Sequence, residues 1–573
     1  MTTMKFNYIT AKWAACLFSL TMVVSACNDM DFLEEVPKDF LAPQNAYNTV
    51  EGINQGITGL HFTVRNDWYF GEELQDVGTI YKALGTDIAF HGEDPNSTRF
   101  LCNYVNYLTP SSEYVREYWN RPYRLIQRVN LLVEGINNAD ESLLTPEERN
   151  AYIAEALFFR AYAYRHLVSF FGDVPVVTEA IDFAKTDFVR DPTSVAYQQM
   201  EEDLSFAVEH LPDPGSEKDP GRITKGAAYH LLTEVYLMQH KYTEAVTAAT
   251  HVINDFGYHL MTERFGSNPD VFGSGDVYSD LFAYGNQNLG ENKESIWVLQ
   301  FEPSTVIGGS NNRWNRAFAP AYFRMGNTPD GKPAFRGELV NGAYTGYSDS
   351  LGRGVAWVRP TNFSAYTIWE GNWNNDIRNA KHMIKRDFYY DSPESAFHGQ
   401  KIDFSKYPAS AGRDAIRDTC QYIYPYFIKF ADPMHVLDNE ATSGNGASYK
   451  DVYAMRLAET YLFRAEAYIG LGELDLAKED INAVRTRSHA KPATTADIDI
   501  DYLLDERARE LYGEDCRHFV LRRTGKLVER VRKYNNNPLN PGLNIQDYHV
   551  LWPIPQEQMD LNIDQQWTQN PGY

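Results

Sequence analysis

The stretches AEALFFRAYAY (residues 154–164) and AETYLFRAEAY (residues 458–468) repeat each other, with seven of eleven positions identical. In both stretches alanine and aromatic residues recur at spacings of three and four, which indicates an amphipathic helix. Small alanine side chains on such a helix allow a partner helix to approach closely. The two stretches therefore predict two helices of the same kind, far apart in the chain.

Each repeated stretch is expected to belong to a helical hairpin. The segments 222–254 and 456–488 share a pattern in which Tyr236 or Tyr468 is followed, six and nine residues later, by a large side chain and an alanine. This spacing resembles that of tetratricopeptide hairpins, in which alanine lies at the close contact between two helices. Gly470 and Gly472 predict the turn of the second hairpin. Further helices are expected at 117–136, 147–170, 190–211 and 499–514.

A different composition separates the helical parts. Residues 257–449 are rich in Gly, Asn, Asp, Ser and aromatic residues, and few helical periods occur there. A disordered linker would lack the tryptophans of this region, so we expect ordered loops and short elements packed on the helices. The predicted fold is mainly α: a scaffold of tetratricopeptide-like hairpins, formed by residues 45–256 and 450–573, with a loop-rich, aromatic-rich insertion at 257–449.

The N-terminus has the pattern of a secretory signal. Residues 1–12 carry two lysines and no acid, and residues 13–26 are almost wholly apolar but too short to span a bilayer. Ser25 and Ala26 directly precede Cys27, as in a bacterial lipobox, where the chain is cut before a cysteine that then carries lipid. We predict a lipoprotein signal peptide at 1–26, a lipid on Cys27 and a tether at 27–44. An ordinary signal peptide with a chance cysteine is the alternative.

Composition excludes several functional classes. The formal net charge is −24 without any basic block, so the chain is a poor binder of nucleic acid. After Cys27 the cysteines are Cys102, Cys420 and Cys516, whose odd number and wide spacing fit neither a disulfide framework nor a CxxC metal site. The sequence contains no GxSxG, HExxH or Walker motif. These features favour an anchored binding or scaffold protein over the enzyme classes that those motifs mark.

Several motifs occur in the order typical of one known family. They are SACND (25–29), YWNRPYRLIQRVN (118–130), AEALFFRAYAY with FGDVPVV (154–177), DERARELYGEDCRHFVLRRTGKL (505–527) and LWPIPQEQMDLNIDQQWTQNPGY (551–573). With them the chain resembles the SusD/RagB family of outer-membrane nutrient-binding lipoproteins over essentially the whole mature chain. The resemblance implies a binding protein without catalysis or cofactor. It also implies a surface position over a SusC-like TonB-dependent transporter, which receives the captured glycan or, in some members, peptide.

Two regions combine the residue types that a sugar site needs. Sugars offer apolar CH faces and many hydroxyls, so aromatic platforms beside polar side chains suit them. In the first region, residues 67–100, the candidates are Trp68, Asp87, His91 and Asn96. In the second, which runs from 311 to 382, they are Trp314, Arg316, Trp357, Tyr366, Trp369 and Trp373. For each tryptophan, packing in the core is the alternative to ligand contact.

Other readings of the same residues remain open. Glu93 and Asp94 beside His91 offer oxygen ligands that suit calcium, but we interpret the segment as a solvated polar loop and predict no metal site. A lipid-anchored glycoside hydrolase would need two carboxylates facing each other across a cleft. A peptide-capturing protein would recognise the backbone groups and the side-chain charges of a bound peptide. A purely structural scaffold would bury the tryptophans of residues 297–373.

Overall fold

The computed structural model describes residues 46–70, 82–93, 101–268, 273–302, 312–340, 342–348, 350–405, 414–433 and 448–573. The predicted signal peptide, the lipid on Cys27 and the tether at 27–44 lie outside the described residues, as do Asp94 and Asn96. Among the described helices, none combines the length and the apolar character that crossing a membrane requires.

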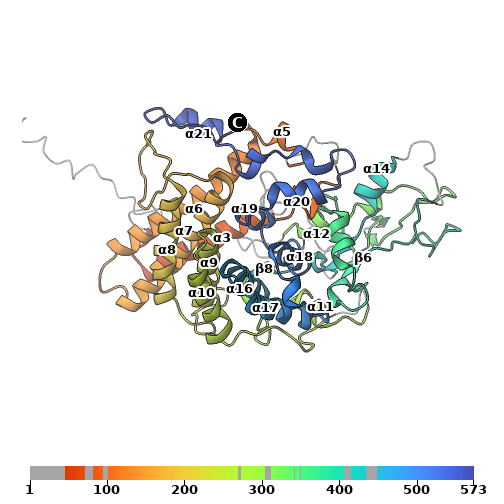
Figure 1. Ribbon diagram of the computed structural model, residues 1–573, viewed down its shortest axis with the longest axis horizontal. Helices are drawn as coiled ribbons and strands as arrows, with labels where there is room; N and C mark the ends of the chain where they lie inside the picture. The colour runs from red at the N-terminus through yellow and green to blue at the C-terminus, as the bar shows by residue number, and fades with distance from the viewer. Residues whose placement is uncertain are drawn as a thin grey trace, which may run out of the picture.

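The N-terminal half is a stack of long helices, as the sequence predicts. Figure 1 shows α6 to α10 at one end of the molecule and α14 and β6 at the other. The helix α7 begins with a capping box between Thr145 and Glu148 and ends at Gly172, whose φ is 74°. The elements are α3 (Val50–Val64), η2 (Arg65–Phe70), α5 (Tyr104–Tyr107), α6 (Glu113–Asn138), α7 (Pro146–Phe171), α8 (Thr193–His210), α9 (Lys225–Met238) and α10 (Tyr242–Asp255).

The C-terminal helices continue this stack, because α16 packs against both α9 and α10. Gly472 ends α16 in a left-handed conformation (φ 79°), as the predicted turn requires. Gly470 lies inside the helix instead, where a Cβ atom would come within 2.5 Å of the Tyr242 ring. The elements are α16 (Leu457–Leu471), α17 (Leu474–Arg487), η8 (Thr495–Asp497), α18 (Ile500–Glu510), α19 (Arg517–Arg523), α20 (Leu527–Tyr534), η9 (Pro541–Asn544), η10 (Asp547–Val550) and α21 (Gln556–Leu561).

The two repeated stretches make the same inter-helix contact. Arg160 of α7 donates from Nε and Nη2 to the carboxylate of Asp203 on α8, at 2.9 and 2.6 Å. Arg464 of α16 donates in the same way to Asp480 on α17, at 2.8 and 2.7 Å. A bidentate arginine–carboxylate pair fixes both distance and orientation. The repeat in the sequence is therefore a repeat of one structural device that clamps the two helices of a hairpin.

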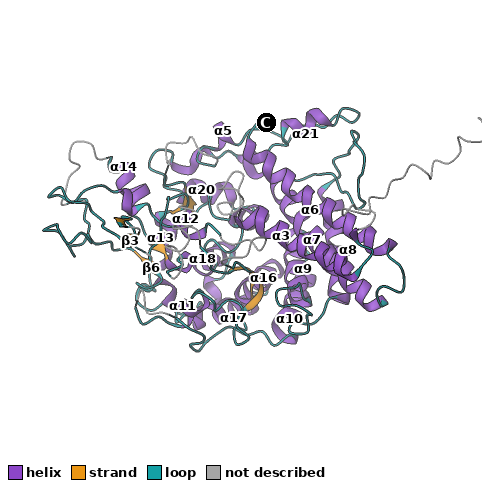
Figure 2. Ribbon diagram, turned by 180° about the vertical axis from the view of Figure 1, so that it is seen from behind, coloured by secondary structure: helices purple, strands orange, loops and turns teal. Residues whose placement is uncertain are grey.

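The loop-rich region consists of short elements packed on these helices. Figure 2 shows its strands as small separate pairs, in keeping with a mainly α fold. The antiparallel pair β2–β8, in which Ser295 lies opposite Arg456, joins the region directly to α16. Its helical elements are α11 (Val277–Leu281), α12 (Trp314–Phe318), η3 (Tyr322–Arg324), α13 (Asn362–Ala365), η4 (Thr367–Trp369), η5 (Ile377–Asn379), α14 (Ala415–Arg417), η6 (Asp418–Tyr422) and η7 (Ile428–Phe430). The strand pairs are β1 (Ala89–Phe90) with β5 (Arg359–Pro360), β2 (Ser295–Leu299) with β8 (Val452–Arg456), β3 (Leu339–Val340) with β4 (Ala343–Tyr344), and β6 (Ile384–Lys385) with β7 (Tyr426–Phe427).

A buried network of charges ties the loop-rich region to the C-terminal helices. We call it the ionic hub. Arg378 of η5 contacts Asp376 at 2.7 Å, Glu506 at 2.7 Å and Glu510 at 2.9 Å. Burial alone would raise the pKa of Glu506, but the guanidinium groups around it lower that pKa to about 2. The hub comprises Glu294, Asp376, Arg378, Arg456, Arg485, Arg487, Glu506, Glu510 and Glu514.

Candidate functional site

Three of the predicted tryptophans lie in the core. Trp68 packs against Tyr162, with the ring centroids 6.0 Å apart, and Trp314 stacks on Phe318 at 5.6 Å. Trp369 is fully buried, and its indole N–H donates to a backbone carbonyl at 3.0 Å. Buried rings offer no face to a ligand, so we assign all three to packing rather than to sugar contact.

Asp87 and His91 also lie inside the protein. The Asp87 carboxylate accepts hydrogen bonds from Arg517 at 2.9 and 2.7 Å and from Arg530 at 2.8 Å. Burial raises the pKa of Asp87, but the two guanidiniums outweigh it and lower the pKa to about 2. The side chain of His91 is buried as well. In place of the predicted ligand contact, Asp87 forms a structural ion pair between the N-terminal half and the helices α19 and α20.

The two predicted regions do meet at one place. The indole N–H of Trp357 donates to Glu93 at 3.1 Å, and Glu93 also pairs with Arg324 at 3.1 Å. The guanidinium of Arg316 lies 5.3 Å from the centre of the Trp357 ring. Burial and the neighbouring guanidiniums lower the pKa of Arg316 to about 10, so it stays charged at neutral pH. Trp357 is 5% exposed and belongs to the core, so only the charged members of this cluster, among them Arg324 and Glu93, reach solvent in part.

One predicted pair of aromatic residues lies on the surface. Tyr366 is 40% exposed and Trp373 is 45% exposed, whereas the other four tryptophans of residues 297–373 are buried. The two rings are parallel to within 5°, with centroids 6.4 Å apart. A face-to-face stack would bring the centroids closer, so the rings are offset. The pair therefore presents parallel aromatic surface to solvent.

Local sequence explains why Trp373 is exposed and Trp369 is not. The Thr361 hydroxyl caps the short helix α13, and Trp369 anchors the following turn in the core. Gly371 then reverses the chain with a φ of 80°, a conformation that favours glycine. The amide of Asn379 donates to the Trp373 carbonyl at 2.7 Å and so holds the end of the loop.

Contacts from the C-terminal helices hold the loop that carries Tyr366 and Trp373 in place. Arg509 of α18 donates to the Ile368 carbonyl at 2.8 Å. The backbone N–H of Ile377 donates to the Ser488 carbonyl, just after α17, at 3.0 Å. Arg378, in the same loop, is a member of the ionic hub. The exposed rings are therefore held on a loop that is fastened to two helices, which favours a preformed binding surface.

Arg386 completes the surface and was not among the predicted residues. Its guanidinium centre lies 5.5 Å from the Tyr366 ring and 4.6 Å from the Trp373 ring. It donates to the Ala365 carbonyl, 21 residues earlier, and to the side-chain oxygen of Asn379. Burial lowers the pKa of Arg386 to about 10, so the group is charged at neutral pH. We call Tyr366, Trp373 and Arg386 the aromatic platform. The sequence carries no local signal for Arg386, because the contact forms only in the folded chain.

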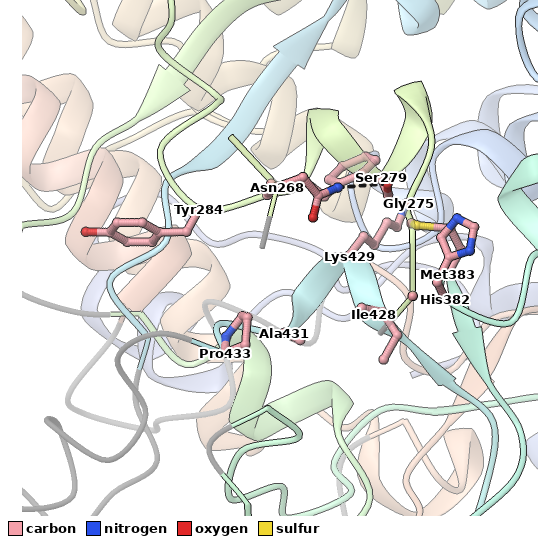
Figure 3. Close-up of a pocket in the computed structure, with 13 residues that line it drawn as sticks. Asn268, Gly275, Ser279, Tyr284, His382, Met383, Ile428, Lys429, Ala431 and Pro433 are labelled. Carbon is pink, nitrogen blue, oxygen red and sulfur yellow. Dashed lines mark hydrogen bonds between the residues drawn. The ribbon is translucent and has the colours of Figure 1, made fainter. Parts of the chain in front are cut away.

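A second feature of the loop-rich region is a small cavity of about 50 Å³, drawn in Figure 3. Asn268 on its wall donates to Ser279 at 2.9 Å, and Lys429 forms an ion pair with Glu514 at 2.9 Å. A space of this size suits ordered water rather than a sugar ring. The polar groups named here are already engaged with each other, so we assign the cavity to structure.

A larger, apolar cavity of about 450 Å³ lies at the other end of the molecule, beside α6. Aromatic side chains from α6, from the loop before α8 and from the C-terminal tail line it: Trp119, Tyr123, Phe183, Phe188 and Trp567. It falls outside both predicted regions. Across the described residues, no group of three or more His, Cys, Asp or Glu side chains is arranged to hold a metal ion.

Known proteins resemble this chain over almost its full length. The SusD-like protein P2 of Formosa agariphila is 31% identical, and the alignment covers 98% of this chain and 100% of that protein. The chain belongs to the SusD family. A model described as the SusD family matches residues 293–573, and one described as "Starch-binding associating with outer membrane" matches residues 31–237. The SusD-like protein P25 of the same organism is 25% identical over 94% of this chain.

Solved structures share the SusD fold. A laminarin-binding SusD-like protein superposes with a TM-score of 0.66 at 22% identity, covering 92% of this chain and 100% of that one. Surface glycan-binding protein A from Bacteroides thetaiotaomicron, in complex with laminarihexaose, superposes with a TM-score of 0.65 at 17% identity, covering 91% of this chain and 99% of that one. The names of these two proteins mention laminarin binding and surface glycan binding. The predictions of the family, of a mainly α fold and of a binding protein are confirmed.

Proposed function

We propose that this SusD family protein is a cell-surface glycan-binding lipoprotein. It captures an oligo- or polysaccharide and delivers it to a SusC-like TonB-dependent transporter. One observation carries the proposal: the aromatic platform exposes two parallel rings beside a charged guanidinium. Aromatic faces suit the CH faces of sugars, and a guanidinium offers several hydrogen-bond donors to hydroxyl oxygens.

The relatives support glycan as the ligand class. One solved relative is named as laminarin-binding, and another holds laminarihexaose. The description of the family model over residues 31–237 names starch binding and association with the outer membrane. The exposure of Trp373 also speaks against a purely structural role, because such a scaffold has no need of an exposed tryptophan on a fastened loop.

The proposed route to the membrane rests on the N-terminal sequence. Residues 1–26 act as the signal peptide, Cys27 carries the lipid, and residues 27–44 form the tether to the outer membrane. Residues 45–256, 257–449 and 450–573 then form one integrated unit, in which the tetratricopeptide-like helices offer a broad surface to the transporter. A weak site suffices for a polymeric ligand, because many copies of the protein can bind the same polysaccharide molecule.

Affinity electrophoresis tests this function directly. Residues 28–573 are prepared as soluble protein and run through gels that contain plant, host or microbial polysaccharides, and each lane is assayed for released reducing sugar. We expect at least one polysaccharide to retard the protein without release of sugar. Tyr366→Ala and Trp373→Ala should abolish the retardation. Phe183→Ala, at an exposed aromatic residue beside α6, is the matched control and should leave it unchanged.

The other outcomes separate the alternatives. Release of reducing sugar would contradict the assignment as a binding protein and favour a glycoside hydrolase. Retardation that survives both platform substitutions would move the site elsewhere, with the cluster around Trp357 as the next candidate. Failure of every polysaccharide to retard the protein would contradict glycan binding and favour capture of peptides.

A further inference from the structure

The guanidinium of Arg386 forms no direct ion pair with any carboxylate of the described residues; the neighbouring Asp387 pairs with Lys401 at 2.5 Å instead. Its hydrogen bonds run from Nε and Nη2 to two neutral oxygens, those of Ala365 and Asn379. The described part of the chain supplies no acceptor for Nη1. The guanidinium is thus oriented by neutral groups, and Asp387, whose charge raises the pKa of Arg386, makes no direct ion pair with it.

This arrangement differs from that of the other half-buried and buried arginines with bidentate contacts. Arg160, Arg464 and Arg517 each donate two hydrogen bonds to one carboxylate. A partly desolvated guanidinium is stabilised by such an anion, and the planar fork matches a carboxylate or a sulfate group. Arg386 is partly desolvated, and its direct contacts are ring faces and neutral acceptors, whereas the Asp387 carboxylate acts on it only from beyond ion-pair distance.

We propose that the aromatic platform selects an acidic glycan. A sugar ring lies on the exposed faces of Tyr366 and Trp373, and its carboxylate or sulfate group binds Arg386. This inference rests on the proposed glycan-binding function and adds the chemical class of the ligand. The anion supplies a directly bound partner, which a neutral sugar does not.

The charge of the whole protein makes such a contact selective. With a net charge of −24, most of the surface repels a polyanion. Glu370, in the same loop as the platform, is exposed and adds to this repulsion. An acidic glycan is therefore bound where a cation and an aromatic face occur together, and not over the surface in general. Added salt should weaken the contact, because the guanidinium is only partly buried.

Matched pairs of polysaccharides test the inference. Polygalacturonate is compared with its methyl ester, and dextran sulfate with dextran, so that each pair differs in charge on one backbone. The mature protein carries Arg386→Gln, which removes the charge, or Arg386→Lys, which keeps it. Arg417→Gln makes the same change of charge at an exposed arginine of the same region and is the control. Thermal unfolding of each variant shows whether the loop is still folded.

We expect the wild type to bind polygalacturonate or dextran sulfate at least about tenfold more tightly than the neutral partner, and the pair that shows this identifies carboxylate or sulfate. Arg386→Gln should remove the preference, Arg386→Lys should keep most of it, and Arg417→Gln should not change it. If Arg386→Gln unfolds the loop, the lysine variant and the salt dependence of wild-type binding still decide the question.

The failures of the two proposals are distinguishable. Equal binding of the charged and neutral members, still abolished by Trp373→Ala, would overturn the acidic ligand and leave the glycan-binding function intact. A preference for the acidic member that persists in a folded Arg386→Gln variant would also overturn the role of Arg386. No binding of any of the four polysaccharides, together with no retardation in the wider panel, would overturn both.

Discussion

The ionic hub and the aromatic platform use arginine in opposite ways, although Arg378 of the hub and Trp373 of the platform belong to one loop. In the hub, each buried guanidinium lies against carboxylates, and the charges compensate each other inside the protein. In the platform, Arg386 lies beside two exposed rings and neutral oxygens. The comparison indicates that paired arginines hold this fold together. In the described part of the chain, Arg359 and Arg522 also donate only to neutral oxygens, those of backbone carbonyls. What marks Arg386 for a ligand is therefore its place beside two exposed rings.

Removal of a hub arginine should have the largest effect on stability. Arg378→Met leaves the carboxylates of Asp376, Glu506 and Glu510 buried without their shared cation, and breaking such a buried set costs about 3–5 kcal/mol. We expect a large drop in the urea midpoint of the mature protein. Arg417→Met, which removes an exposed arginine paired with Asp414, should change the unfolding free energy by less than about 0.5 kcal/mol. Similar midpoints for the two variants would contradict the structural role of the hub.

The pH dependence of stability should differ from that of binding. Burial lowers the pKa of His518 to about 4, so the unfolded chain takes up a proton first and stability falls as the pH drops below about 6.5. Glu506, with a pKa of about 2 in the folded state, stabilises the fold above its ordinary pKa of 4.5, and this contribution is lost as the pH falls toward 2.

Arg386 keeps its charge until the pH approaches about 10. Glycan binding should therefore stay constant between about pH 5 and 8, while the urea midpoint decreases over the lower part of that range. Both quantities are measured on the same mature protein in the same buffers. A parallel loss of binding and stability would show that the platform depends on the titrating core.

Two tryptophans in one loop provide a sharper comparison. Trp373→Ala should weaken glycan binding at least about tenfold, which corresponds to about 1.4 kcal/mol and is enough to abolish retardation by a weak site, because it removes an exposed ring. Its effect on the unfolding free energy should stay near 0.5 kcal/mol, as expected at an exposed position. Trp369→Ala should instead destabilise the protein by about 3–5 kcal/mol, because it leaves a cavity in the core. Calorimetric binding and urea titration on both variants measure the two effects, and equal effects would remove the distinction between site and core.

The smallest expected effect concerns the rim of the platform. Glu370→Gln removes a repulsive charge from the platform loop and should raise the affinity for polygalacturonate by less than about threefold, since exposed charges interact weakly. The affinity for the methyl ester should not change. An increase for both polysaccharides would show that Glu370 acts through the shape of the loop and not through its charge.

The helices could be predicted from the sequence because their periodicity is local. The spacing of alanine and aromatic residues predicts α7, α16 and the hairpin of α9 and α10, and the structure has them at the expected places. The sequence does not predict features that depend on contacts with a residue from another helix or strand. Gly470, predicted to lie in a turn, lies in α16, where the absence of a side chain leaves room for the Tyr242 ring of α10.

The site was less predictable than the fold, for physical reasons. Trp369 and Trp373 are alike by residue type and lie four positions apart, yet one lies in the core and the other on the surface, on either side of the turn at Gly371. The carboxylate of Asp87 is a chemical group that could bind a sugar, but it is buried and paired with two arginines from the far end of the chain. Arg386 reaches the platform only through tertiary folding. Pattern reasoning found the region of the platform and two of its three members.

The ion pair of Asp87 sets an order of folding. Its partners Arg517 and Arg530 follow 430 and 443 residues later, whereas α6, α7 and α8 pack chiefly on helices next to them in the chain. During synthesis from the N-terminus, these helices have their partners long before Asp87 has its cations, and a buried carboxylate without a cation is strongly unfavourable. We therefore expect the centre of the molecule to close last, once α19 and α20 have been made. A chain truncated before Arg517 should form its N-terminal helices but leave the region around Asp87 unfolded.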